Sequence, residues 1–311
     1  MPASVAVERK PVMNRLSSVA AALLLLSFSA TALSAPPPLP PSGAAPAGAP
    51  AASGSVALLY KFTVGQVLTY HMTMSNNVTT SVAGQTILAN DTVDMTLVNT
   101  IQSIDSAGNA TIVGQVQNVN TAMTMNGQPT PMPQSSIDQL KSGTTTVLSP
   151  QGKIVSMKFN AEPAGGGPMD PSTLMSAMGS FSLLPSSPVK VNDTWRTTIP
   201  MPMFSSPMFV KMALLGLDTS SGSTIADISS KYYSDLKMAP SAGTPLAMTG
   251  QMSGAGNSKF DVDKGYMSST SANMTMDMSM TPPSTPGADV PTGKMTMRMV
   301  MAMKLNLVGA S

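Results

Sequence analysis

Two long segments near the C-terminus alternate between apolar and polar residues, and most of the apolar positions are methionine. Successive side chains of a β-strand point to opposite faces, so a period of two predicts a strand with one apolar face. Residues 266–280 and 294–308 therefore predict two strands, each spanning roughly 50 Å at about 3.3 Å per residue. We expect strands of this length to belong to a broad, curved antiparallel sheet. Their main apolar positions are Met274, Met276, Met278 and Met280 in the first segment, and Met295, Met297, Met299, Met301, Met303, Leu305 and Leu307 in the second.

Similar alternation marks further strands earlier in the chain. The first of them, at 67–75, has Met72 and Met74 on its apolar face. Further strands are predicted at 93–97, 110–119, 144–148, 153–159, 193–199, 208–217 and 224–231. Only 134–141 and 171–180 indicate short helices. The sequence thus predicts a mainly β fold, with one large antiparallel sheet curved into a half-barrel or open sandwich and one or two short helices.

The first 32 residues have the pattern of a cleavable signal peptide. Three positive charges precede an apolar run at 16–28, and Ala-Thr-Ala at 30–32 fits a signal-peptidase site. A start at Met13 and an uncleaved N-terminal anchor are the alternatives for this segment. We expect a protein exported to the periplasm or the extracellular space.

The rest of the chain divides into a linker and one domain. Residues 33–55 are rich in Pro and Ala and have little to bury, so we expect an extended linker. Residues 56–308 predict a single β-rich domain. No integral membrane segment is expected after signal cleavage, because no later apolar run is long enough to span a bilayer.

Composition excludes several kinds of chemistry. The chain has no cysteine and therefore no lipobox, disulfide or cysteine nucleophile. Its one histidine, His71, falls on the polar face of its predicted strand, and one histidine cannot build a histidine metal site. Basic and acidic residues number 17 and 15, or 14 each without the first 32 residues, which argues against a nucleic-acid partner. We expect a non-enzymatic protein without a cofactor.

The 29 methionines are the unusual feature of this composition. Methionine is unbranched and polarizable, so alternating methionines can fill a core or line a face that adapts to a hydrophobic small molecule or lipid. Thioethers also bind Cu(I). A structural core, a ligand-binding face and a Cu(I)-binding protein therefore stay open, as does a structural, envelope-associated role without a ligand. The candidate ligand-binding residues are Met72, Met74, Met274, Met276, Met278, Met295, Met297, Met299, Met301 and Met303.

Three turn-and-strand motifs carry a family resemblance. They are Tyr-x-Phe-x-x-Gly-x-x-x-x-Tyr at 60–70, Leu-Pro-x-x-Pro-Val-x-Val-x-Asp-Thr-Trp at 184–195 and Phe-Asp-x-x-x-Gly at 260–265. Together they resemble a group of uncharacterised bacterial secreted proteins, whose general shape is similar to that of the periplasmic lipoprotein carriers. The resemblance implies a half-barrel over residues 56–308 that holds acyl chains on its concave face, and it transfers no site residues. Asn192 stands where the relatives usually have Gly; Asn tolerates the left-handed conformation, so we expect the turn to be kept.

The segment Asp261–Gly265 begins like a calcium-binding loop. It lacks the third oxygen ligand and the distal Glu of such loops, and Lys264 would repel a cation. We therefore expect a hairpin turn at this position.

Overall fold

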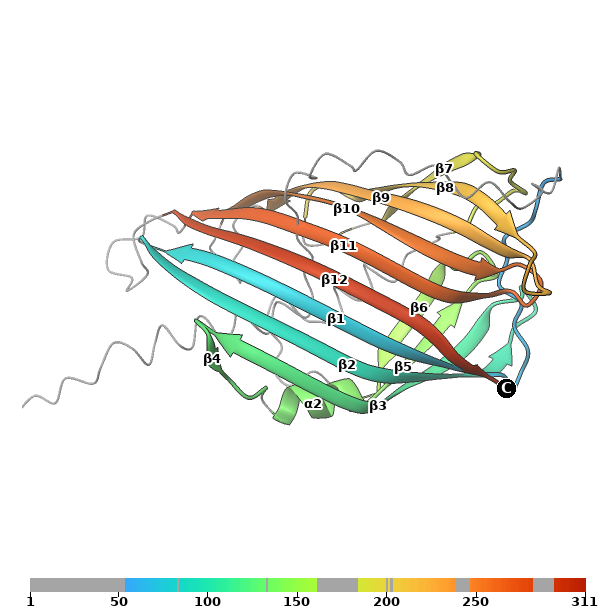
Figure 1. The fold of residues 1–311 in the computed structure, drawn as a ribbon, viewed down its shortest axis with the longest axis horizontal. Helices are drawn as coiled ribbons and strands as arrows, with labels where there is room; N and C mark the ends of the chain where they lie inside the picture. The colour runs from blue at the N-terminus through green and yellow to red at the C-terminus, as the bar shows by residue number, and fades with distance from the viewer. Residues whose placement is uncertain are drawn as a thin grey trace, which may run out of the picture.

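The computed structural model describes residues 54–82, 84–132, 134–160, 184–199, 201, 204–238, 247–281 and 294–311. Within these residues the chain forms one sheet of 12 strands and one short helix (Figure 1). The elements are β1 (Val67–Val82), β2 (Gln85–Ile104), β3 (Ala110–Met125), β4 (Gln128–Pro129), α2 (Gln134–Lys141), β5 (Thr144–Leu148), β6 (Ile154–Phe159), β7 (Thr194–Ile199), β8 (Met208–Asp218), β9 (Ile225–Met238), β10 (Ala247–Asp261), β11 (Tyr266–Thr281) and β12 (Met295–Ala310).

The sheet consists of two antiparallel meanders that meet along the first and the last long strand. Neighbouring strands follow the order β6-β5-β3-β2-β1-β12-β11-β10-β9-β8-β7, with the short β4 beside β3. β1 pairs with β12 along most of its length, with Met74 opposite Met303, so the two ends of the β-rich region lie at the centre of the sheet. β6 and β7 are its edges, and in the described part of the chain they do not pair with each other.

The predicted mainly β fold with one large, curved antiparallel sheet is confirmed. The segments 266–280 and 294–308 are β11 and β12, and the helix predicted at 134–141 is α2. The helix predicted at 171–180 lies outside the described residues. So do the predicted signal peptide and the linker, apart from its last two residues.

The sequence pattern does not predict β10, because glycines interrupt the alternation of apolar and polar residues in this strand. Glycine has low strand propensity and offers no side chain to pack, and this strand contains Gly250, Gly254 and Gly256. The structure gives the reason for them. A Cβ on Gly254 would lie 2.7 Å from Cγ of Met274 and 2.8 Å from the carbonyl oxygen of Asn273. The glycines of β10 thus leave room for the methionines of β11.

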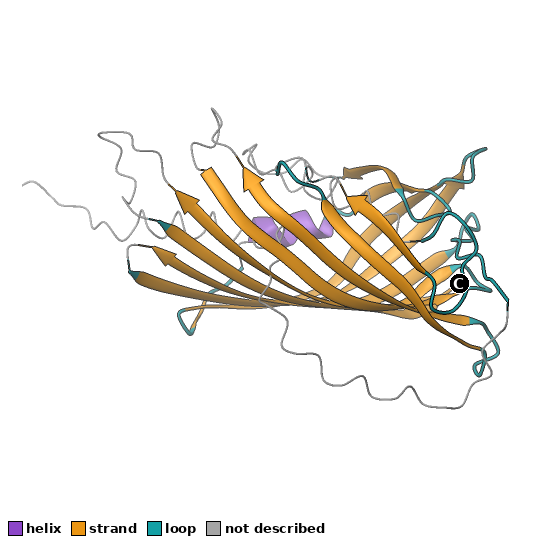
Figure 2. Ribbon diagram, turned by 90° about the horizontal axis from the view of Figure 1, so that it is seen from above, coloured by secondary structure: helices purple, strands orange, loops and turns teal. Residues whose placement is uncertain are grey.

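An extended segment before β1, residues 56–65, closes one end of the sheet, and we call it the strap. Val56 pairs with Val189 in the loop that leads into β7, and the Tyr60 N–H donates to the Pro150 carbonyl in the β5–β6 turn at 2.7 Å. Four residues of strap span at most roughly 13 Å, whereas ten strand spacings of about 4.8 Å would separate the edges of a flat sheet by roughly 48 Å. The sheet is therefore strongly curved, as Figure 2 shows, and the regions next to its two edges approach each other at the strap.

The strap also shows which face of the sheet is inside. Leu58 is 1% exposed, and the Tyr60 ring meets the Phe260 ring edge-on with 5.4 Å between centroids. Both pack into one hydrophobic core with Leu214 and Met299. Burial raises the pKa of the Tyr60 hydroxyl to about 12. Because the strap bridges the curved sheet and packs on these side chains, the face with the methionines is the concave one.

Candidate functional site

The strand register brings the methionines of separate segments onto one concave surface. Met276 of β11 lies opposite Met299 of β12 and Met252 of β10. Across the centre of the sheet, Met303 of β12 lies opposite Met74 of β1. We call this surface the methionine face, and it contains all ten candidate residues. Its members are Met72, Met74, Met95, Met248, Met252, Met274, Met276, Met278, Met280, Met295, Met297, Met299, Met301 and Met303.

Burial divides the methionine face into two parts. On β10 to β12 it is mostly core, where Met276 is 2% and Met299 0% exposed. Met72, Met74 and Met303 flank the seam between β1 and β12 and are half-buried; we call them the seam methionines. The core part belongs to the same hydrophobic cluster as Leu58 of the strap. The seam methionines lie outside that cluster and keep part of their surface exposed.

A polar pair interrupts the methionine face beside the seam. Asn76 of β1 lies opposite Asp91 of β2 on one side and Met301 of β12 on the other. The Asn76 side-chain amide Nδ2 donates to Oδ2 of Asp91 at 2.8 Å, and the two residues are 1% and 3% exposed. The other oxygen of each side chain, Oδ1, is buried without a hydrogen-bond partner. A buried polar group left unsatisfied costs about 1–3 kcal/mol, so the pair lowers the stability of the fold as it stands.

Burial also changes the acidity of this pair. Removal from water disfavours the charged carboxylate and raises the pKa of Asp91 above its ordinary value, and the hydrogen bond from Asn76 offsets part of that rise. Met301 and Met123 lie on either side of the pair and supply no full charge to compensate it. The pair is therefore a polar point with two free acceptor oxygens inside an apolar surface.

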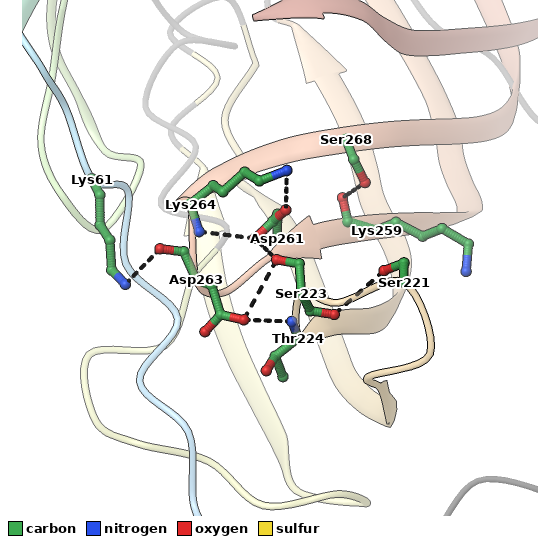
Figure 3. Close-up of polar contacts among 9 residues, drawn as sticks. All are labelled: Lys61, Ser221, Ser223, Thr224, Lys259, Asp261, Asp263, Lys264 and Ser268. Atoms are coloured by element: carbon green, nitrogen blue, oxygen red, sulfur yellow. Dashed lines mark hydrogen bonds and ion pairs between the residues drawn. The ribbon is translucent and has the colours of Figure 1, made fainter.

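The turn at Asp261–Gly265 contrasts with this pair. The predicted hairpin is confirmed, and Figure 3 shows how its carboxylates are used. Oδ1 of Asp261 accepts from the Ser223 hydroxyl at 2.6 Å and from the Lys264 N–H at 2.8 Å. Oδ2 of Asp263 accepts from the Thr224 N–H at 2.6 Å. These carboxylates stabilise the turn, and the described residues contain no group of three His, Asp or Glu side chains that could hold a metal ion.

His71 lies on the convex face, as its position in the strand predicts. Its Nε2 is 2.9 Å from Oδ2 of Asp94, with the two side chains 41% and 44% exposed. The Thr73 hydroxyl donates to the same oxygen at 3.2 Å. The cluster is open to solvent on the side of the sheet away from the methionine face.

The turn before β7 behaves as its motif predicts. Asn192 adopts a φ of 73°, the left-handed conformation that Asn tolerates. Its N–H donates to the Leu214 carbonyl at 2.7 Å, and Oδ2 of Asp193 accepts from the Lys190 N–H at 2.8 Å. Trp195 follows and packs against the hydrophobic core. The motif thus anchors the start of β7.

Two depressions lie away from the seam methionines. One of about 530 Å³ is lined mainly by convex-face side chains, among them Gln251, Asp277 and Arg298. The other, of about 300 Å³, lies beside Trp195 and Pro188.

Sequence reasoning missed the polar pair, although the sequence contains a signal for it. Asn76 continues the apolar phase of Met72 and Met74, and Asp91 stands in phase with Val93. β1 ends at Val82 and β2 begins at Gln85, and the pairing of these two residues sets the register that puts Asn76 opposite Asp91. A polar residue in the apolar phase of each partner strand is therefore the pattern to look for.

Comparisons with known proteins do not assign a family, since no family model and no curated protein matches the chain. Lipovitellin, in a structure described by its lipid–protein interactions, shares 11% identity at a TM-score of 0.47, over 81% of this chain and 26% of that one. The chain thus spans about a quarter of the lipovitellin chain.

Two further solved structures are similar in part. An outer membrane channel from Pseudomonas putida F1 shares 6% identity at a TM-score of 0.20, over 80% of this chain and 97% of that one. A DUF1329 family protein from Desulfovibrio piger shares 9% identity at a TM-score of 0.15, over 80% and 88%. Among the described residues, no helix is long and apolar enough to cross a membrane. TM-scores this low carry no functional argument, and the resemblance to periplasmic lipoprotein carriers stays a prediction.

Proposed function

We propose that this chain is an exported, non-enzymatic protein that binds a hydrophobic ligand, such as a lipid or another acyl-chain molecule, at the seam methionines. The observation that carries the proposal is the meeting of Met72, Met74 and Met303 on the concave face of a curved sheet, where they are half-buried. An apolar surface in this position gains free energy when a ligand removes it from water, at about 25 cal/mol per Å².

The chemistry of methionine supports this choice of ligand. Three rotatable bonds and a polarizable sulfur let a methionine surface fit apolar molecules of different shapes. The balanced charge of the chain argues against polyanionic partners. Export is proposed from the N-terminal signal pattern, and it places the protein where envelope lipids are available.

A pair of neighbouring substitutions tests the proposal. Met303→Gln puts an amide onto the seam, whereas Lys304→Gln changes the next side chain, which is exposed on the convex face. We expect M303Q to weaken binding of the apolar fluorophore N-phenyl-1-naphthylamine by roughly fivefold, or about 1 kcal/mol, and K304Q to leave it unchanged. Native mass spectrometry of the exported protein should also detect co-purified lipid. No probe binding and no lipid would refute the proposal.

Cu(I) binding is a second candidate, favoured by one arrangement on the core part of the face. Met252, Met276 and Met299 lie opposite one another on three adjacent strands, which brings three thioethers into one row. Replacing Met297, Met299 and Met301 by Leu removes the sulfur but keeps the apolar volume. Loss of Cu(I) binding against a competing chelator in this variant, with probe binding retained, would show that the metal site is separate from the seam.

A further inference from the structure

We infer that the Asn76–Asp91 pair holds the polar end of the ligand, and that this end carries a hydrogen-bond donor, a hydroxyl or an amine. The inference rests on the proposed function, because it assumes that a hydrophobic molecule occupies the seam. It goes further by naming the class of ligand, an amphiphile with a donor at one end.

The chemistry of the free atoms sets the requirement for a donor. One N–H of the Asn76 Nδ2 amide donates to Oδ2 of Asp91. The two atoms without partners, Oδ1 of Asn76 and Oδ1 of Asp91, are both acceptors. A hydroxyl or an ammonium group can donate to them, whereas an ether or an ester oxygen brings only another acceptor.

The position of the pair fits the end of a chain bound at the seam. On the concave face, Asn76 is the next residue of β1 after Met74, and Met303 lies opposite Met74. The pair is buried, with Met301 opposite Asn76 and Met123 opposite Asp91. Methionine side chains change rotamer readily, so they can move aside for a small polar group. A chain lying over the seam methionines would thus bring its end to the two free oxygens.

A second buried aspartate in the same sheet shows that unsatisfied oxygens are not a general property of this fold. Asp261 is as buried as Asp91, 3% exposed in each case. Oδ1 of Asp261 accepts hydrogen bonds from Ser223 and Lys264, and its Oδ2 is 3.5 Å from the Lys264 ammonium. Asp261, which stabilises the turn, finds its hydrogen-bond partners within the chain. Asp91, on the methionine face, keeps one oxygen without a partner.

Three probes of equal chain length test the inference on the full exported chain: 1-dodecanol, dodecylamine and dodecyl methyl ether. Each is titrated against bound N-phenyl-1-naphthylamine, so that displacement reports its affinity. We expect the alcohol or the amine to bind at least about tenfold more tightly than the ether, because only they satisfy the free acceptors. The two donor probes also distinguish a hydroxyl from an ammonium group.

A double variant tests whether the preference for donor probes comes from the Asn76–Asp91 pair. Asn76→Leu with Asp91→Leu removes both polar groups together, and we expect all three probes to bind it with the affinity of the ether. Lys304→Gln is the control, because it changes an exposed side chain on the convex face and should keep the preference. The comparison of probes on the unaltered protein needs no variant to fold. Equal affinities of all three probes there would overturn the inference and leave the proposed function standing, whereas no displacement by any probe would overturn both.

Discussion

The two halves of the sheet are built from similar strands but are buried to different extents. In the C-terminal half, β7 to β12, alternate residues of β8 are buried, among them Val210 and Leu214. In the N-terminal half, every residue of β5 is half-buried, and the buried residue of β3 is Ala110. The hydrophobic core draws most of its strand residues from the C-terminal half and few, such as Val78 and Ala89, from the other.

The two halves therefore contribute differently to one continuous sheet. The C-terminal half supplies most of the strand residues of the hydrophobic core, so it contributes most of the apolar burial that stabilises the fold. The N-terminal half shares the same concave surface, with Val93 and Met95 of β2 buried and β5 half-buried. The seam methionines and the polar pair lie where the two halves meet.

The largest expected difference is between a core methionine, Met299, and a seam methionine, Met303. Both lie on the concave face of β12. Met299 is 0% exposed, and we expect Met299→Ala to lower the free energy of unfolding by about 2–5 kcal/mol. Met303→Ala should cost less than half as much, since its side chain is only half-buried. Urea denaturation of the two variants measures both losses. Equal losses would mean that the seam is as closed as the core.

The glycines of β10 give the next largest effect. A Cβ on Gly254 would lie 2.7 Å from Cγ of Met274, so Gly254→Ala should cost about 1–3 kcal/mol through overpacking. Gly309 at the end of β12 is the control, because the nearest atom to its Cβ would be 3.7 Å away on Thr69. Gly309→Ala should leave the thermal midpoint unchanged or raise it slightly. A Gly254→Ala variant as stable as Gly309→Ala would show that the methionines of β11 are loosely packed.

The polar pair allows single and double substitutions to be compared. Asn76→Leu alone leaves the buried Asp91 carboxylate without its amide donor, and we expect a loss of about 1–3 kcal/mol. The double replacement of both residues by Leu should come within about 1 kcal/mol of the unaltered chain, because no unpaired group remains. Denaturation at neutral pH distinguishes the two. A double variant less stable than the single one would argue that the pair stabilises the fold.

The smallest effect is a dependence of stability on pH. Burial raises the pKa of Asp91, so the folded chain binds this proton more tightly than the unfolded chain does. The contribution of Asp91 to the free energy of unfolding is therefore greatest below its ordinary pKa and is lost as the pH rises through the raised value. Asp91→Asn removes this titration and leaves the rest of the chain unchanged. Stability of the unaltered chain relative to D91N should fall with rising pH, and a relative gain would contradict the assignment.

The sequence was most informative where the physical signal is local. Period-two alternation identified β11 and β12 because methionines alternate with polar residues over a long run of each strand. It failed for β10, where Gly250 and Gly254 occupy positions that face the methionines of β11. There the packing of a neighbouring strand decides the residue type, and no pattern within β10 reports it.

The methionine face needed information beyond single strands. Alternation placed Met74 and Met303 each on an apolar face, but their meeting depends on the pairing of β1 with β12, which is separated from it by most of the domain. The burial of each methionine also depends on the curvature of the sheet and on the strap. The sequence therefore does not predict which methionines belong to the core and which to the seam. The pairing of Asn76 with Asp91 is the exception, since β1 and β2 follow each other closely in the sequence and Val82 pairs with Gln85.

The strap has a consequence for the order of folding. Its Lys61 N–H donates to the Gly265 carbonyl at 3.0 Å, so the strap is bonded to a residue about 200 positions later in the chain. Contacts of such long sequence separation slow folding, because the intervening chain must be organised before they can form. Both meanders therefore have to assemble before this end closes. The contact between Lys61 and Gly265 would therefore be among the last to form, and its presence would mark a domain whose two meanders are both complete.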